Sequence, residues 1–267
     1  MERRKRTAPS IAAMKKAGEK VAVLTAYDCM TAKLVDAAGV DMILVGDSAA
    51  MVVLGHENTL PVTLEEMVML TAAVARARTA ALVVGDMPFM SYQASASDAV
   101  RAAGRMVKDG GAGAVKLEGG RKVVRKIQAV LDAGIPVMGH IGLTPQSIHE
   151  LGGYRVQGKN DETRARLLDD ARALDETGCF SMVLEAIPWQ LGRDITEAVS
   201  IPTIGIGAGP HCDGQVLVIN DIIGYTDGPV PRFVRRYGDA GKVVSEAAAG
   251  FVRDVKSGAY PDLDESY

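Results

Sequence analysis

The stretch Met42-Ile-Leu-Val-Gly-Asp-Ser48 decides which folds the rest of the chain can adopt. Four apolar residues run unbroken and are followed by a glycine and an acid. A run of this length that ends at a turn signal is typical of a strand buried on both faces, as in a parallel sheet. Asp47 and Ser48 then follow the strand at its carboxyl end, where a polar side chain can leave the core.

The same pattern recurs along the chain. Similar apolar runs end in an acid at Asp86, Glu118 and Glu185, and another run ends at His140. Parallel strands bring their carboxyl ends to one edge of the sheet, so these polar side chains should converge there. We interpret this edge as the active site.

Strands of this kind alternate with helical segments over 267 residues, close to the ~250 that are typical of a (β/α)8 barrel. We therefore expect an α/β fold, a (β/α)8 TIM barrel that forms a single domain over residues 1–267. A short N-terminal helix is expected at residues 8–17, and tails at residues 1–7 and about 258–267. The eighth strand is expected at Gln215–Ile219 and a last helix at residues 238–258. An open doubly wound sheet is the alternative fold.

One long connection separates the second and third β/α units. Residues 49–62 show neither a helical nor a strand period, which is typical of lids and binding loops. Thr63 and Glu66 then form the pattern of a capping box at the start of a helix. Asp161 is expected to cap a later helix, and Thr144 with Pro145 to begin a short one.

The composition excludes several classes of protein. Aromatic residues make up 4% of the chain and the net charge is −3, so we expect no nucleic-acid partner and no attraction to acidic membranes. The most apolar stretch is interrupted by Arg76 and Arg78, so no membrane-spanning helix is expected. The three cysteines are far apart and show no metal-binding spacing, which favours buried thiols in a reducing cytoplasm.

Three acids are expected on one rim of the barrel, namely Asp47, Asp86 and Glu118. Neighbouring carboxylates repel one another, so their convergence predicts a bound cation. Oxygen ligands alone select a hard ion, and we expect Mg²⁺. The alternative is that each acid caps the following helix or pairs with a nearby base.

Three further polar residues share this rim. Lys116 lies two residues before Glu118 and therefore points to the same side of the strand, where it would bind an anionic substrate or form a structural ion pair with Glu118. Glu185 ends a mostly apolar strand, which suits proton transfer, although it could cap the next helix. His140 is a possible ligand, acid–base group or hydrogen-bonded core histidine.

Two weaker signals follow the sixth and seventh strands. Gly205–Pro210 could bind phosphate, as this region does in many barrels, or could form a tight turn without a ligand. Trp189 has no evident stacking partner, so we expect it to pack in the core or at an interface.

Seven motifs together resemble the 3-methyl-2-oxobutanoate hydroxymethyltransferase (ketopantoate hydroxymethyltransferase) family. The resemblance covers residues 8 to 257 and its specificity comes from the order and spacing of the motifs. They are Leu24–Asp28, Val45–Ser48, Gly85–Pro88, Val115–Gly119, Gly139–Pro145, Leu184–Glu185 and Gly205–Leu217.

The resemblance implies an activity. A hydroxymethyl group would pass from 5,10-methylenetetrahydrofolate to 3-methyl-2-oxobutanoate through a magnesium-stabilised enolate, giving 2-dehydropantoate and tetrahydrofolate. This is the first step of pantothenate biosynthesis. The resemblance also implies a cytoplasmic homodecamer that binds small-molecule substrates and one Mg²⁺ per subunit.

It further implies roles for individual residues. Asp47, Asp86 and Glu118 correspond to the metal site, and Glu185 corresponds to the proton acceptor. The contacts to the oxo acid correspond to Asp47, Ser48, Asp86 and Lys116. His140 is a possible additional site residue whose role stays open.

Two rival interpretations come from other classes. A magnesium-dependent 2-oxo-acid lyase of the phosphoenolpyruvate/pyruvate barrel superfamily would cleave a C–C bond without folate. Such lyases commonly carry a reactive cysteine in a lid, and residues 49–62 contain none. A catalytically silent binding barrel would not need the charged residues that gather at this rim.

Overall fold

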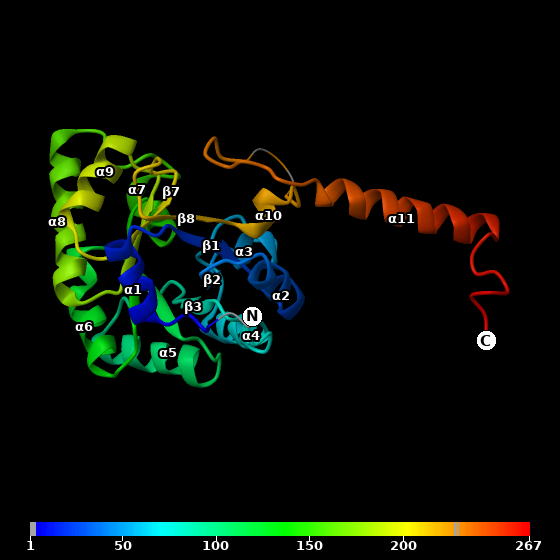
Figure 1. Ribbon diagram of the computed structural model, residues 1–267, viewed down its shortest axis with the longest axis horizontal. Coiled ribbons are helices and arrows are strands. Elements are labelled where there is room, and N and C mark those ends of the chain that lie inside the picture. Colours follow the sequence, from blue (N-terminus) through cyan, green and yellow to red (C-terminus); the bar gives the residue numbers. More distant parts are fainter. Residues whose placement is uncertain (1–3, 227, 229) are drawn as a thin grey trace. The chain divides into compact units, whose positions relative to one another are not determined.

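The computed structural model describes residues 4–226, 228 and 230–267 of the chain. They form two compact units, the first ending at Val218 and the second running from Ile219 to Tyr267. In the first unit, eight parallel strands close into a barrel in the order β1 to β8, with helices around it (Figure 1). The expected (β/α)8 fold is therefore confirmed, and the open doubly wound sheet is excluded.

The strands match the apolar runs of the sequence closely. The eighth strand ends before its expected limit of Ile219, because Ile219 begins a short helix instead. The strands are β1 (Val21–Thr25), β2 (Met42–Val45), β3 (Leu82–Asp86), β4 (Ala114–Glu118), β5 (Val137–Gly142), β6 (Ser181–Glu185), β7 (Thr203–Ile206) and β8 (Gly214–Leu217).

The helices of the first unit alternate with these strands. They are α1 (Ala8–Ala17), α2 (Cys29–Ala37), α3 (Ala49–Val52), α4 (Leu64–Ala75), α5 (Ala96–Lys108), η1 (Arg121–Val123), α6 (Val124–Asp132), η2 (Pro145–Ser147), α7 (Ile148–Leu151), α8 (Asp161–Thr177) and α9 (Trp189–Ala198). The long connection at residues 49–62 was expected to lack a helix and instead begins with α3, whose first two alanines are buried.

Side-chain caps begin several helices. The capping box of Thr63 and Glu66 at α4 is confirmed. The expectation for Asp161 is wrong by one residue, because Asn160 accepts the hydrogen bond from the Thr163 backbone N–H at 2.9 Å. Thr144 precedes η2 without a side-chain capping bond, so only its position was predicted correctly.

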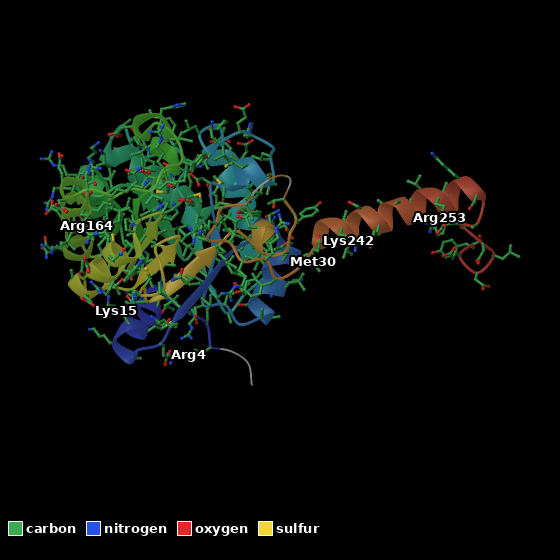
Figure 2. All side chains as sticks on the ribbon, turned by 90° about the horizontal axis from the view of Figure 1, so that it is seen from above. Arg4, Lys15, Met30, Arg164, Lys242 and Arg253 are labelled. Atoms are coloured by element: carbon green, nitrogen blue, oxygen red, sulfur yellow. The ribbon has the colours of Figure 1, made fainter. Side chains whose placement is uncertain are left out.

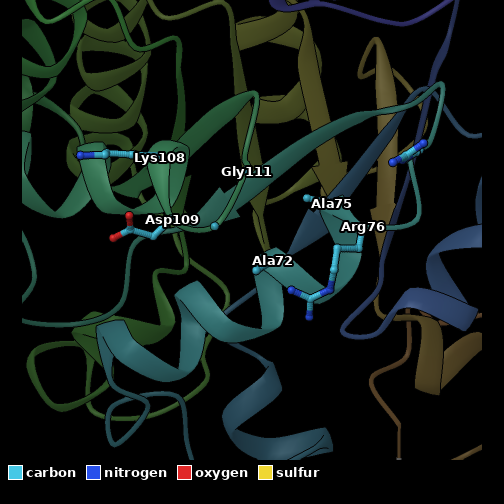
Figure 3. A pocket seen from close by; sticks show the side chains of 8 residues that line it. Ala72, Ala75, Arg76, Lys108, Asp109 and Gly111 are labelled. Carbon is cyan, nitrogen blue, oxygen red and sulfur yellow. The ribbon is translucent and has the colours of Figure 1, made fainter.

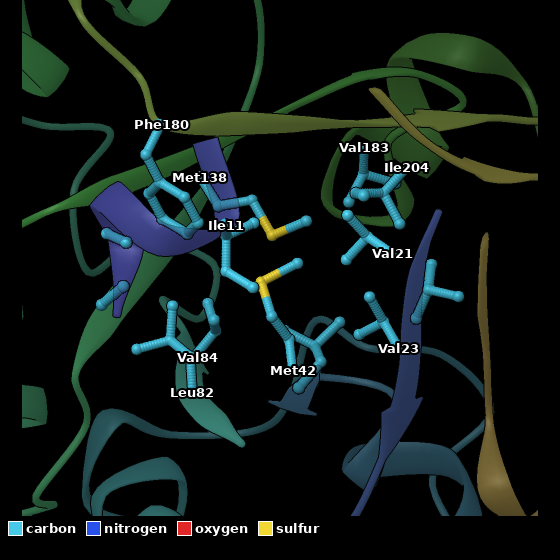
Figure 4. Packing of buried hydrophobic residues seen from close by; sticks show 14 of the residues in the cluster. Ile11, Val21, Val23, Met42, Leu82, Val84, Met138, Phe180, Val183 and Ile204 are labelled. Carbon is cyan, nitrogen blue, oxygen red and sulfur yellow. The ribbon is translucent and has the colours of Figure 1, made fainter. Parts of the chain in front are cut away.

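The barrel interior is apolar at the amino ends of the strands. Inward-facing residues such as Met42, Val84 and Met138 form one cluster with Ile11 and Met14 of α1 (Figure 4). α1 closes this end with buried apolar side chains. The buried acids, Lys116 and His140 lie towards the carboxyl ends of the strands. The apolar core therefore lies directly beneath these polar residues, on the amino-terminal side of the barrel.

Polar contacts hold α1 and the segment before it in place. The side chain of Lys15 pairs with Asp213 at 3.0 Å, and Arg6 pairs with Asp41 at 2.8 Å. Arg6 was expected to belong to a solvated tail, and this ion pair ties it to the barrel instead. Residues 1–3 of that expected tail lie outside the described residues.

A surface pocket lies at the same end of the barrel. It is lined by the carboxyl ends of α4 and α5, including Arg76 and Lys108, and by Gly111 ahead of β4 (Figure 3). Helices in this fold run back towards the amino ends of the strands. This pocket is therefore remote from the rim on which the acids were expected.

The second unit contains α10 (Ile219–Ile222) and α11 (Ala240–Ser257). The helix expected at residues 238–258 is confirmed. None of the described residues of α11 is buried, and its charged side chains include Lys242 and Arg253 (Figure 2). The expectation that residues 1–267 act as one domain stays a prediction.

Two expected absences concern membranes and disulfides. Among the described residues, no helix combines the length and apolar character needed to cross a bilayer. The three cysteines are all free thiols. Cys179 and Cys212 are buried as expected, whereas Cys29, the first residue of α2, is only partly buried.

Candidate metal centre and active site

The register of neighbouring strands brings the predicted site residues together. Asp86 of β3 pairs with Lys116 of β4, and Glu118 of β4 pairs with His140 of β5. Paired residues of neighbouring parallel strands project to the same face of the sheet. Residues that are far apart in the sequence therefore become lateral neighbours inside the barrel.

Asp47, Asp86 and Glu118 form one buried cluster. Each offers a carboxylate oxygen, and these three oxygens lie within 4.8 Å of one another. The backbone N–H of Asp47 donates to Asp86 Oδ2 at 3.2 Å. The expected convergence of the acids is confirmed, and none of the three lies out on the surface as a separate helix cap would.

The cluster has a shortage of positive charge. Burial, together with the carboxylates of Asp86 and Glu118, raises the pKa of Asp47 well above its usual range. Burial also raises the pKa of Asp86, although Lys116 opposes the shift. A divalent cation would relieve this repulsion, and three buried carboxylates form the all-oxygen donor set that hard cations prefer. The residues present therefore fit a magnesium-type ion.

Lys116 is the ammonium group within this cluster. Its Nζ lies 2.8 Å from Asp86 Oδ1 and 3.3 Å from Glu118 Oε1. Burial alone would lower the pKa of Lys116, but the three surrounding carboxylates outweigh burial and raise it. The ion pair with Glu118, offered as a structural alternative, is present, and the shorter contact is with Asp86.

His140 links the acid cluster to Glu185. Its Nδ1 lies 3.3 Å from Glu118 Oε1, and its Nε2 lies 3.2 Å from Glu185 Oε2. Burial and Lys116 lower the pKa of His140, but the two carboxylates outweigh them and raise it to about 9. Burial would raise the pKa of Glu118, yet Lys116 and His140 bring it down to about 2. His140 therefore lies between Glu118 and Glu185, and its Nδ1 is also 3.2 Å from Lys116 Nζ.

Ser48 and Glu185 are the most accessible of the predicted residues. Ser48 follows Asp47 and is hydrogen-bonded through its hydroxyl to Tyr27 at 2.8 Å. The side chain of Glu185 is 17% exposed, whereas those of His140 and Glu118 are nearly inaccessible. A substrate that enters the barrel mouth can therefore reach Glu185 directly.

Sequence reasoning missed two residues that contact the acids. Gln146, in η2, donates through Nε2 to Asp47 Oδ2 at 3.0 Å and through its backbone N–H to Glu118 Oε2 at 3.0 Å. Tyr92 is buried beside it and hydrogen-bonds to Gln146 Oε1 at 2.8 Å. The only signal for Gln146 was its position just after the strand that ends near His140.

One contact joins α3 to the segment that follows α7. Tyr154 follows α7 and reaches Met51 of α3, with 3.7 Å between its hydroxyl oxygen and the methionine Sδ. Burial, together with Asp47, Glu185 and Glu118, raises the pKa of Tyr154. The side chain of Tyr154 therefore lies within the electrostatic reach of the acid cluster.

The weaker signals near Gly205–Pro210 have a packing explanation. A Cβ at Gly209 would lie 2.3 Å from Trp189 Cβ, so the glycine is needed for close approach. The expectation that Trp189 packs in the core is wrong, because its side chain is 47% exposed, and packing at an interface stays a prediction. Its ring lies tilted against that of His211, with 5.5 Å between ring centroids, a pairing that was not evident in the sequence. Close packing against Trp189 explains the glycine at this turn, and phosphate binding by the segment stays a prediction.

Comparisons with known proteins agree on one family. A family model described as ketopantoate hydroxymethyltransferase matches residues 5–263. A 3-methyl-2-oxobutanoate hydroxymethyltransferase from Geobacter metallireducens is 58% identical over 264 residues, which are 99% of each chain. A protein of the same name from Thermoanaerobacter sp. is 51% identical over 253 residues, covering 95% of this chain and 92% of that protein.

Solved structures resemble the chain at low identity. A 2,3-dimethylmalate lyase of the PEP mutase/isocitrate lyase superfamily has a TM-score of 0.61 and 17% identity, with 97% of this chain and 91% of that chain covered. A phosphonopyruvate hydrolase has a TM-score of 0.63 and 12% identity, with 97% and 93% covered. At this level of identity the likeness shows the shared barrel fold alone.

Proposed function

The chain belongs to the ketopantoate hydroxymethyltransferase family and is a one-carbon transferase, and from this premise we propose how its barrel mouth works. The substrates are 3-methyl-2-oxobutanoate, 5,10-methylenetetrahydrofolate and one water molecule, and the products are 2-dehydropantoate and tetrahydrofolate. The reaction is the first step of pantothenate biosynthesis. The observation that supports this assignment most strongly is the buried carboxylate cluster around Lys116 at the carboxyl ends of the strands.

Asp47, Asp86 and Glu118 would hold one Mg²⁺, since their oxygens lie together and their charges are only partly balanced. When bound, the ion acts as a Lewis acid that makes a proton next to the substrate carbonyl more acidic. Asp47, Ser48, Asp86 and Lys116 would position the oxo acid. The ammonium group of Lys116 supplies positive charge for the anionic substrate.

Glu185 is the proton acceptor in this proposal. It accepts the proton from C3 of the oxo acid. Water breaks the C–N bonds of the folate methylene group, which releases tetrahydrofolate and gives the one-carbon unit as formaldehyde. The electron pair left at C3 attacks the formaldehyde carbon, and the formaldehyde oxygen takes up a proton to become the new hydroxyl group. His140 Nε2 lies 3.2 Å from Glu185 Oε2, so His140 is next to the proposed base and can form an ion pair with it when protonated.

An assay with both substrates, with and without Mg²⁺, tests this function. We expect formation of 2-dehydropantoate that depends on both folate and the metal. Cleavage of a 2-oxo acid without folate would instead support the lyase alternative. Calorimetry that detects neither Mg²⁺ nor oxo-acid binding would support a silent barrel.

We also propose that the chain assembles with copies of itself as a homodecamer. Large apolar side chains stay exposed along α11, which marks an interaction surface. They include Val243, Val244, Phe251, Val252 and Val255. Light scattering coupled to gel filtration tests this, with a mass of ten 28.1 kDa chains expected and the mass of a single chain contradicting it.

A cytoplasmic location completes the proposal. Support comes from the biosynthetic enzymes that the chain resembles and from its three free thiols. Cell fractionation tests it, because recovery in the membrane or extracellular fraction would contradict a cytoplasmic enzyme.

A further inference from the structure

Gln146 contacts two of the three clustered acids at once. Its side-chain Nε2 donates to Asp47 Oδ2, and its backbone N–H donates to Glu118 Oε2, each at 3.0 Å. Asp47 follows β2, whereas Glu118 ends β4, so the two carboxylates belong to strands that are not neighbours. One residue from a third segment, η2, thus links them from the side.

The amide of Gln146 can adopt only one orientation. Its Nε2 also donates to the carbonyl oxygen of Met87 at 2.9 Å. Its Oε1 accepts from the Tyr92 hydroxyl at 2.8 Å and from Gln93 Nε2 at 3.0 Å. A primary amide has two N–H donors and two acceptor sites, and all four are used. A rotated amide would place its oxygen against the Asp47 carboxylate and lose these bonds.

Tyr92 determines this orientation from the other side. The residue is 1% exposed, and its hydroxyl oxygen accepts a hydrogen bond from the Glu118 backbone N–H at 3.1 Å. The hydroxyl carries a single proton, and its shortest acceptor contact is with Gln146 Oε1. Tyr92 therefore connects the backbone of β4 to the Gln146 amide, which in turn donates to Asp47.

We infer that Gln146 is a positioning residue that holds the carboxylates of Asp47 and Glu118 in the arrangement needed by a divalent cation, and that Tyr92 fixes the Gln146 amide. The inference rests on the proposed metal site. Each bond from Gln146 fixes one oxygen of a carboxylate and so sets the direction of the other. Such outer partners commonly change metal affinity by about 10- to 100-fold when they are removed.

Mn²⁺ binding to the metal-free enzyme tests the inference without any turnover. Calorimetry gives both the dissociation constant and the number of sites per chain. We expect Gln146→Leu to raise the dissociation constant by about 10- to 100-fold with the site number unchanged. Tyr92→Phe should raise it by a smaller factor, because the Gln146 backbone bond to Glu118 remains. Gln128→Leu, an exposed glutamine on α6, is the matched control and should bind like wild type.

The outcomes separate the inference from the metal site itself. Three results together would overturn the inference alone: wild type binds Mn²⁺, Asp47→Ala does not bind it, and Gln146→Leu binds it with the wild-type dissociation constant. If Gln146→Leu shows fewer Mn²⁺ sites per chain and a lower melting temperature but an unchanged dissociation constant, the role of Gln146 is merely structural. That result also overturns the inference. Wild-type enzyme without saturable Mn²⁺ binding would overturn both. If Gln146→Leu does not fold, Tyr92→Phe provides the test. An unchanged dissociation constant for Mn²⁺ in Tyr92→Phe would overturn the inference that Tyr92 holds the Gln146 amide in place for the metal site.

Discussion

Lys116 and Asp86 are paired across β4 and β3, and the ammonium nitrogen of Lys116 lies 2.8 Å from Asp86 Oδ1. Both side chains are almost fully buried, as is Glu118 on the other side of the ammonium. One lysine therefore stands among three carboxylates. The excess of negative charge favours the binding of a cation at this site. An anionic substrate can then bind beside that cation.

Replacing Lys116 by methionine keeps the length of the side chain and removes its charge. We expect kcat/KM to fall by about 10²-fold or more because the oxo acid loses a charged partner. The metal-free protein should lose about 3–5 kcal/mol of unfolding free energy, since buried carboxylates lose their counter-ion. Mg²⁺ binding should not weaken, because a repelling charge is gone.

Steady-state kinetics, urea unfolding in EDTA and calorimetry measure these three effects. Lys33→Met, at an exposed position of α2, is the control and should match wild type in all of them. Wild-type turnover in Lys116→Met would exclude Lys116 from the substrate site.

The exchange of the C3 proton of 3-methyl-2-oxobutanoate for deuterium, measured by NMR without folate, isolates the step assigned to Glu185. Glu185→Gln should slow the exchange by about 10²- to 10⁴-fold, because an amide cannot accept the proton. Glu197→Gln, on the exposed side of α9, should exchange at the wild-type rate. Equal rates for Glu185→Gln and wild type would show that another group accepts the proton.

The raised pKa of His140 predicts how the stability of the metal-free protein changes with pH. Its pKa rises from 6.5 to about 9 in the folded chain, chiefly because Glu118 and Glu185 overcome the effects of burial and Lys116. The folded state therefore holds the proton more tightly. The resulting stabilisation, of the order of 3 kcal/mol, is complete below pH about 6.5 and disappears as the pH rises through about 9.

Chemical unfolding of wild type and His140→Asn in EDTA, followed from pH 6 to 10, measures this contribution. The difference in unfolding free energy should be largest at pH 6 and shrink towards pH 10. A difference that is constant or grows with pH would show that His140 is neutral in the folded protein.

Much of the site was predictable because its signals are local in the sequence. Apolar runs that end in acids identified β2, β3, β4 and β6 together with their rim residues. The two-residue spacing of Lys116 and Glu118 placed both in the barrel interior, because strand geometry alternates between faces. Barrel closure then made the separate strand ends converge.

The missed features depend on long-range packing. Gln146 and Tyr92 come from a 3-10 turn and from a loop, where no periodicity says which way a side chain points. Trp189 and His211 meet only because the start of α9 packs beside the loop between β7 and β8. The capping error at Asn160 has another origin, because two adjacent residues both have good capping side chains.

Because α1 closes the amino-terminal end of the barrel, a substitution in its buried face should lower stability without affecting catalysis. Ile11 is completely buried in the cluster that closes the lower barrel. Ile11→Ala should cost about 2–5 kcal/mol of unfolding free energy, measured by urea unfolding. The kcat of the folded variant should stay at the wild-type value because the rim is remote. Lys16→Ala on the exposed face of α1 is the control. An equal loss of unfolding free energy in Lys16→Ala would contradict the structural role given to the buried face of α1.

Gly142 determines where Glu185 can lie. The two residues pair across β5 and β6, and the backbone N–H of Leu143 donates to the Glu185 carbonyl oxygen at 2.8 Å. Gly142 has a φ of 97°, and a Cβ there would lie 2.2 Å from the same oxygen. Gly142→Ala must therefore push the end of β6 away, whereas Asp47, Asp86 and Glu118 belong to other strands.

We expect C3 exchange to fall by about 10²-fold in Gly142→Ala, the effect of a displacement of about 1 Å at a catalytic group, while Mg²⁺ affinity stays near wild type. Gly152→Ala is the matched control, because Gly152 also has a positive φ of 70° but no atom within 4 Å of an added Cβ. It should lose stability through backbone strain and keep its exchange rate. Equal exchange in the two variants would mean that strain alone, and not the contact with Glu185, requires glycine at position 142.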